Sequence, residues 1–168
     1  MPTQSLASLP GGTNVFIDAN IFIHGLSGQS AQCWQLLERC SREEVTGITL
    51  YEILNEATHQ FMLAEAVAKK HISLVKPADQ LRAKFRIVSV LTDYWRQTER
   101  MLSLNLLFLS TEESIVRRAQ VERAAAGLLT NDSMIVACMR QYGIQYLASR
   151  DRDFERANGI TVFRPDDV

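Results

Sequence analysis

Short apolar runs alternate along the chain with longer segments in which apolar positions recur every three to four residues. The short runs are bounded by turn-forming residues and predict strands at 15–17, 47–50, 106–109, 146–148 and 161–163. The longer segments predict helices at 29–43, 51–70, 78–103, 111–127 and 131–142. This alternation indicates an α/β fold, a three-layer α/β/α sandwich with a mostly parallel central sheet.

The chain's length of 168 residues suits one domain. Residues 1–13 are rich in Ser, Pro and Gly and are expected to form a flexible N-terminal lead-in to a single domain over 14–168. Cys33, Cys40 and Cys138 form no zinc-binding pattern and indicate reduced thiols. With no signal peptide or membrane-spanning run in the sequence, we expect a cytoplasmic protein without a membrane partner.

The formal net charge of −1 provides no overall positive field to attract nucleic acid. Any contact with nucleic acid must therefore come from a local basic face. Clustered acids in one site would themselves lower the net charge, so near-neutrality does not exclude an acidic nuclease. The sequence contains neither GxGxxG nor GxxxxGK[ST], which disfavours a nucleotide-binding fold.

Acidic residues recur where predicted strands lead into helices. Four such junctions carry them: Asp18 after 15–17, Glu52 and Glu56 after 47–50, Asp132 after the apolar stretch 128–130, and Asp151 after 146–148. In a parallel sheet these junctions meet at one edge, which is where ligands bind. Converging carboxylates repel one another unless a cation lies among them, and hard oxygen ligands suit Mg²⁺ or Mn²⁺. Such ions promote phosphodiester hydrolysis by activating a bound water and neutralising charge on the phosphate.

Each acid also has a purely structural interpretation. Asp18 and Asp132 could serve only as helix N-caps. One of the two glutamates could lie on a solvated helix face, and Asp151 could be a turn residue within the charged run 150–153. The structural interpretation weakens when all four junctions have to be explained together.

Several segments resemble PIN-domain nucleases. VFIDAN at 15–20 resembles the opening strand and first acid of that family, and TNDSMIVA at 130–137 resembles the helix that carries its third acid. LASRDRDF at 147–154 resembles the closing block, and TVFRP at 161–165 the final strand. The resemblance extends over 14–165 and includes the VapC-like toxins of toxin–antitoxin modules.

The resemblance implies a metal-dependent endoribonuclease, the toxin of a toxin–antitoxin pair. Its catalytic and metal-site acids would be Asp18, Asp132 and Asp151, holding Mg²⁺ or Mn²⁺. The second acid stays open. The segment 49–52 resembles small toxins and points to Glu52, whereas 53–66 resembles a longer subgroup with the acid three residues before a His and favours Glu56.

The resemblance also implies supporting residues and partners. Asn20 would orient Asp18, Ser149 would help to position a metal-bound water, and Asp153 would support the closing block. Arg150 and Arg152 flank the proposed site and are candidates for contacting RNA. The implied partners are an RNA substrate, a small antitoxin protein and a second copy of the chain in a homodimer.

Two other functions are alternatives. An inactive PIN-like scaffold is disfavoured because no acid position is lost. Another metal-dependent phosphate hydrolase could use Asp18 as a nucleophile, but Asn20 stands where that chemistry usually has a second Asp. The long middle segment at 78–110 departs from compact family members and leaves the substrate groove undefined.

Overall fold

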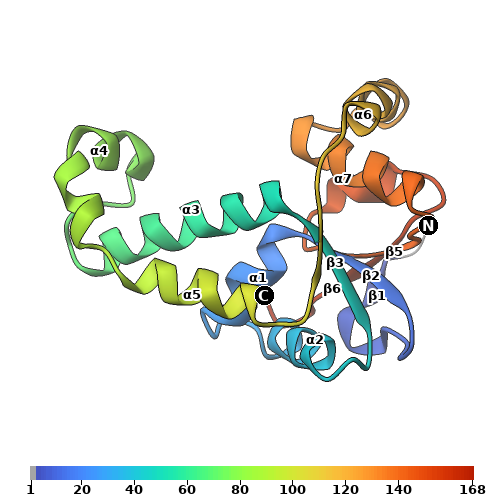
Figure 1. Ribbon diagram of the computed structural model, residues 1–168, viewed down its shortest axis with the longest axis horizontal. Helices are drawn as coiled ribbons and strands as arrows, with labels where there is room; N and C mark the ends of the chain where they lie inside the picture. The colour runs from blue at the N-terminus through green and yellow to red at the C-terminus, as the bar shows by residue number, and fades with distance from the viewer. Residues whose placement is uncertain (1–2) are drawn as a thin grey trace.

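The structure, a computed structural model, describes residues 3–168. At its centre lies one six-stranded sheet in the order β1-β6-β5-β2-β3-β4, and every neighbouring pair of strands is parallel (Figure 1). The strands are β1 Gln4–Ser5, β2 Asn14–Ile17, β3 Thr46–Leu50, β4 Leu107–Leu109, β5 Tyr146–Ala148 and β6 Thr161–Arg164. The predicted α/β class with a parallel sheet is confirmed.

The register of the central strands aligns the residues that follow them. Phe16 of β2 lies opposite Ile48 of β3 and Leu147 of β5. Phe16 and Leu147 are fully buried, as expected where helices cover both faces of a parallel sheet. One residue beyond the paired ends of β2 and β5 stand Asp18 and Ser149, which therefore lie side by side at the carboxyl edge.

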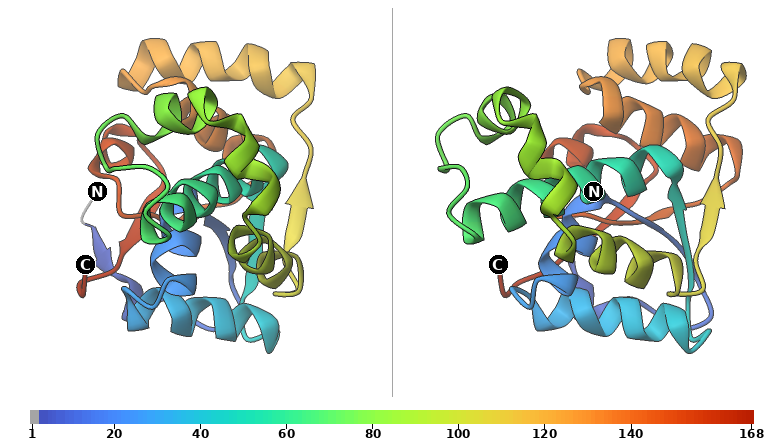
Figure 2. Two further views of the ribbon diagram at one scale, coloured as in Figure 1. Left: turned by 90° about the vertical axis from the view of Figure 1, so that its left-hand side faces the viewer. Right: turned by 60° about the vertical axis from the view of Figure 1, so that its left-hand side comes forward.

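Helices form the two outer layers. They are α1 Ala19–Leu26, α2 Ala31–Ser41, α3 Tyr51–Ala68, α4 Pro77–Ala83, α5 Asp93–Leu102, α6 Glu113–Ala126 and α7 Thr130–Gln141, with 3-10 turns η1 Leu6–Ser8, η2 Phe85–Val90 and η3 Arg152–Arg156. Figure 2 shows α2 below the sheet and α7, backed by α6, above it. The helix α3 begins at the carboxyl edge and extends with α5 beyond the sheet (Figure 1). Within residues 3–168, no helix combines the length and apolarity needed to cross a membrane.

The segment predicted as a single helix at 78–103 is instead α4, η2 and α5. The backbone leaves the helical conformation at Lys84, with φ −104° and ψ 43°, and is extended at Leu91. A new helix starts where the Glu65 carboxylate of α3 accepts hydrogen bonds from the backbone N–H groups of Thr92 and Tyr94, both at 2.8 Å. The single-helix prediction was wrong, and the start of α5 depends on a side chain from another helix, which local periodicity does not report.

Two further expectations need correction. Residues 4–8, expected within a flexible lead-in, form β1 and η1, and Leu6 and the following Leu9 are buried beside the sheet edge. The apolar stretch 128–130 is not a strand: residues 128 and 129 belong to the connection from α6, and α7 begins at Thr130. Gly127 ends α6 in the left-handed conformation with φ 63°, and the chain turns at once into α7. Asp132 therefore lies at a junction between two helices.

Candidate active site

The carboxyl edge of the sheet opens into a cavity of about 570 Å³. Its walls come from the end of β2, from α1, α3 and α7, and from the turn after β5. The four acids favoured from the sequence all line it, namely Asp18, Glu56, Asp132 and Asp151. Asn20 lines it as well. Although Asp132 follows a helix rather than a strand, α7 still brings it to the same place as the other three.

Asp18 is the most deeply placed acid of the cavity, with 8% of its surface exposed. One carboxylate oxygen caps α1 by accepting a hydrogen bond from the backbone N–H of Ala19 at 2.7 Å. Burial raises the pKa of Asp18 to about 6, although hydrogen bonds from Ser149 and Ala19 oppose the shift. The nearby charges of Glu56 and Asp132 raise it further. Asp18 is thus both an N-cap and an acid whose ionised form the protein disfavours.

A hydrogen-bond network holds the second oxygen of Asp18. It accepts hydrogen bonds from Asn20 Nδ2 at 2.6 Å and Ser149 Oγ at 2.7 Å. Asn20 in turn accepts one from the backbone N–H of Arg150 at 2.9 Å, and Ser149 Oγ accepts one from the backbone N–H of Asp151 at 3.0 Å. The network joins the ends of β2 and β5 and fixes how the Asp18 carboxylate faces the cavity.

Asp132, Asp151 and Asp153 form a compact acidic group. One carboxylate oxygen from each lies within 4.8 Å of the other two. Burial raises the pKa of Asp132 to about 6, and the charges of Asp151, Asp153 and Glu56 add to the shift. Arg156 offsets part of this, because its guanidinium pairs with Asp153 at 2.8 Å. Asp153, expected only to support the site, therefore belongs to the same acidic group as Asp132 and Asp151.

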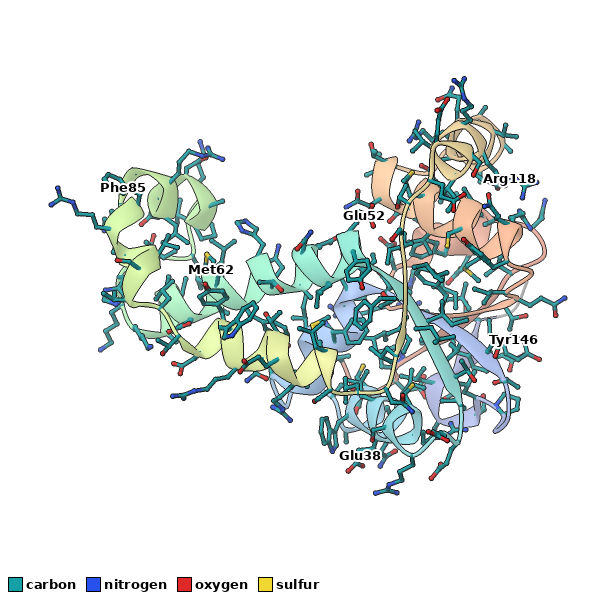
Figure 3. All side chains as sticks on the ribbon, viewed as in Figure 1. Glu38, Glu52, Met62, Phe85, Arg118 and Tyr146 are labelled. Atoms are coloured by element: carbon teal, nitrogen blue, oxygen red, sulfur yellow. The ribbon has the colours of Figure 1, made fainter. Side chains whose placement is uncertain are left out.

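The two candidate glutamates of α3 lie in different surroundings. Glu56 lines the cavity, and its Oε2 accepts a hydrogen bond from Asn131 Nδ2 at 3.1 Å. Glu52 is exposed and is not among the residues that line the cavity; together with Glu56 it lines a neighbouring, mainly apolar hollow of about 240 Å³ between α3, α6 and α7. Figure 3 shows Glu52 at the start of α3, facing α7. This geometry favours Glu56 as the second acid of the cavity.

A basic hollow of about 460 Å³ adjoins the acidic cavity. The two share Asn20 and Asp151 as lining residues. The predicted RNA-contacting residues Arg150 and Arg152 line the basic hollow together with Arg164 of β6. An anionic strand crossing the acidic cavity would thus meet positive charge on the β5 and β6 side.

Sequence reasoning missed three residues of this region: Gln60, Asn131 and Arg164. Two of them carried a signal. Gln60 follows Glu56 by one helical turn, and Asn131 directly precedes Asp132 at the start of α7. Arg164 carried none, because only the pairing of β5 with β6 brings it near Arg150.

The donors of the cavity suit a divalent cation. They are hard carboxylate oxygens, and a cation among them would stabilise the ionised forms that burial and mutual repulsion now disfavour in Asp18 and Asp132. Among residues 3–168, no cysteine or histidine lines the cavity, which disfavours a zinc or other soft-metal site.

This fold and arrangement of acids define the class of protein. The PIN domain family model matches residues 15–160, and the chain belongs to that family. Ribonuclease VapC6 of Methanocaldococcus jannaschii is 24% identical over 157 residues, covering 90% of this chain and 97% of that protein. Ribonuclease VapC2 of the same organism is 24% identical over 153 residues, covering 88% and 91%.

Solved structures share the fold. VapBC2 from Rickettsia felis, bound to a DNA fragment from its promoter, aligns with a TM-score of 0.60 at 14% identity, over 91% of this chain and 99% of that chain. VapC20 of Mycobacterium tuberculosis, a sarcin-ricin loop cleaving toxin, aligns with a TM-score of 0.57 at 15% identity, over 89% and 98%. At these identities the likeness establishes the architecture alone.

Proposed function

We propose that this chain is a metal-dependent endoribonuclease that hydrolyses RNA phosphodiester bonds. The observation that carries the proposal is the convergence of Asp18, Glu56, Asp132 and Asp151 on one cavity in a PIN-domain fold. The relatives named as ribonucleases support RNA as the substrate. A divalent cation, Mg²⁺ or Mn²⁺, would be held by these acids with Asp153 beside them.

When bound, the cation would activate a water and neutralise charge on the scissile phosphate. The residues of the chain prepare the site for it. Asn20 and Ser149 hold the Asp18 carboxylate in one orientation, and Asn131 does the same for Glu56. Arg150 and Arg152 would contact the phosphates of the strand from the basic hollow.

The alternative in which Asp18 attacks phosphate as a nucleophile fits the site poorly. Its two carboxylate oxygens accept hydrogen bonds from Ala19, Asn20 and Ser149. These contacts leave a lone pair on Oδ1, but Asn20 stands where that chemistry usually has a second Asp, and its amide cannot act as the general acid. The arrangement is better suited to a carboxylate that holds a cation.

We further propose that the chain is the toxin of a toxin–antitoxin pair, with a small antitoxin as its partner, and that it forms a homodimer. Structures with the same fold include VapBC2 and a toxin–antitoxin complex from Klebsiella pneumoniae, which supports an antitoxin partner. Exposed apolar side chains on α6 and the α6–α7 connection, including Val121 and Leu129, offer surface for protein contacts.

The test is RNA cleavage by the purified chain. Total cellular RNA would be incubated with and without Mg²⁺ or Mn²⁺, beside Asp132→Asn and the control Glu113→Gln, an exposed acid of α6 paired with Arg117. We expect discrete fragments that require the metal, persist in the control and vanish in Asp132→Asn. Intact RNA with both metals, from folded protein free of antitoxin, would refute the nuclease and favour a binding module.

A further inference from the structure

Positive charge is concentrated in one segment of this nearly neutral chain. Every lysine of the sequence lies between positions 69 and 84, and Arg82 and Arg86 bring the cations of 69–86 to six, against one acid, Asp79. The whole segment, residues 69–92, comprises α4, η2 and the turns around them. It forms a projection at the end of α3 farthest from the sheet (Figure 1).

Most of this charge is uncompensated. Lys69 pairs with Glu65 and Asp93, and Arg82 pairs with Asp79 at 3.2 Å. The other four cations are exposed and form no ion pair with any residue of 3–168; they are Lys70, Lys76, Lys84 and Arg86. Lys84 donates a hydrogen bond to the backbone carbonyl of His71, which leaves its charge unneutralised.

Apolar groups stand exposed beside these cations. Phe85 is 68% exposed and Leu74 is 82% exposed. The Arg86 guanidinium carbon lies 5.9 Å from the centre of the Phe85 ring, and Figure 3 places Phe85 on the projection. The projection has its own small core around Leu81 and Leu91, so the exposed side chains are not needed to hold it together. Unpaired cations beside an exposed aromatic ring are the features that bind single-stranded nucleic acid.

The acidic cavity and a groove that leads along α3 towards the projection share a lining residue. Gln60 lines the cavity and also a groove of about 360 Å³ that continues to Leu74 and Pro77. At 1.5 Å of rise per residue, Glu56 and Ala68, the last residue of α3, lie about 18 Å apart along the helix. A strand that follows this path must be several nucleotides long.

We propose that the projection is a second RNA-binding site, which holds the substrate at a distance from the cleavage site. This inference rests on the proposed function, because it takes the bound RNA to be the substrate. It implies that the enzyme selects RNA long enough to follow α3 and that very short oligonucleotides use the acidic cavity and basic hollow alone. RNA is favoured over an acidic protein segment because the stacking surface of Phe85 accompanies the cations.

Binding of RNA by the full chain carrying Asp132→Asn, in Mg²⁺, tests the proposal without depending on cleavage. Fluorescence anisotropy would compare a mixed-sequence single strand of about 24 nucleotides with one of about 5, which is too short to reach both sites. The test variant combines Lys70→Gln, Lys76→Gln and Arg86→Gln. The control removes the same charge elsewhere through Arg42→Gln, Arg117→Gln and Arg118→Gln. Phe85→Ala is measured separately.

We expect the test variant to bind the long RNA about tenfold more weakly and to reduce the slope of log K against log salt by about 2, since each phosphate contact on a single strand contributes about 0.7. Phe85→Ala should weaken the same binding about fivefold or more. The affinity of the test variant for the short RNA, and that of the control variant for the long RNA, should change by no more than about twofold.

Equal losses in the test and control variants, or equal losses for long and short RNA, would overturn the second site. The cleavage assay on the unmodified chain separates the two proposals. If the chain cuts RNA but its affinity for the long RNA does not depend on the projection, only the second site is refuted. If the affinity for the long RNA depends on the projection but the chain cuts no RNA, only the nuclease proposal is refuted.

Discussion

Two buried carboxylates in this molecule have pKa values shifted in opposite directions. Asp18 in the acidic cavity is 8% exposed and Glu65 beneath the projection is 6% exposed. Burial raises the pKa of Asp18 to about 6, despite its hydrogen bonds from Ser149 and Ala19. Burial also acts to raise the pKa of Glu65, but Lys69 and the backbone amides of Tyr94 and Thr92 outweigh it and lower the pKa to about 2.

The difference separates a structural acid from a proposed functional one. The fold supplies Glu65 with a cation and two backbone donors, and in return Glu65 fixes the start of α5. Asp18 and Asp132 instead lie near other acids, so the positive charge needed to stabilise their ionised carboxylates has to come from outside the chain. This comparison can be tested by removing one charge at a time.

The largest effect is expected for Asp132→Asn. RNA cleavage should fall about 10³-fold, which corresponds to ~4 kcal/mol of lost transition-state stabilisation. Without metal at pH 7, however, the variant should be more stable than the unmodified chain by about 1–2 kcal/mol, because it removes a charge that the folded state disfavours.

The pH dependence of this gain follows from the direction of the shift. The pKa of Asp132 rises from 3.8 to about 6 on folding, so ionisation destabilises the fold increasingly between these values. The stability gain of Asp132→Asn should be full above about pH 6 and vanish below about pH 4. Urea denaturation in EDTA across this range measures it. A loss of stability at pH 7 would show that Asp132 is a structural acid like Glu65.

Glu65→Gln should have the opposite effect on stability. Replacing the carboxylate should cost about 2–3 kcal/mol at pH 7, because it removes the partner of Lys69 and weakens two hydrogen bonds to α5. The pKa of Glu65 falls from 4.5 to about 2 on folding, so its contribution is present above about pH 4.5 and is lost as the pH falls towards 2. The matched control is Glu113→Gln, which breaks an exposed pair with Arg117 and should cost less than about 0.5 kcal/mol. If the two variants lost equal amounts of stability, Glu65 would not be the stabilising structural acid that is contrasted with Asp18.

Metal should stabilise the unmodified chain and leave Asp132→Asn almost unchanged. A ligand that binds only the folded state at about ten times its Kd adds ~1.4 kcal/mol. The rise in Tm with added Mg²⁺ or Mn²⁺ measures this effect, with Glu65→Gln as the control that should keep it. A rise of the same size in Asp132→Asn would place the cation elsewhere.

How far the sequence predicts this molecule depends on whether a feature is local. Apolar runs and capping residues are local, so β5, β3 and the Gly127 end of α6 follow from the sequence alone. The convergence of Asp18, Glu56 and Asp151 was predictable once the strands were taken as parallel, whereas Asp132 was placed there from a strand that the structure does not have. The start of α5 within 78–103 was not, because Glu65 fixes it from another helix. The place of Arg164 depends on strand pairing in the same way.

The smallest effect is expected at Glu52, and it resolves the one acid that the sequence left open. Glu56 lines the cavity and raises the pKa values of Asp18 and Asp132, whereas Glu52 is exposed in the neighbouring hollow. Glu56→Gln should therefore reduce cleavage about 10²-fold, and Glu52→Gln by no more than about twofold. The two variants make the same change of atoms at positions one helical turn apart, so each controls for the other. Single-turnover cleavage at saturating Mg²⁺ compares them. Should Glu52→Gln prove the more damaging, α3 would have to rotate or shift on binding metal or RNA, and the second acid would be Glu52.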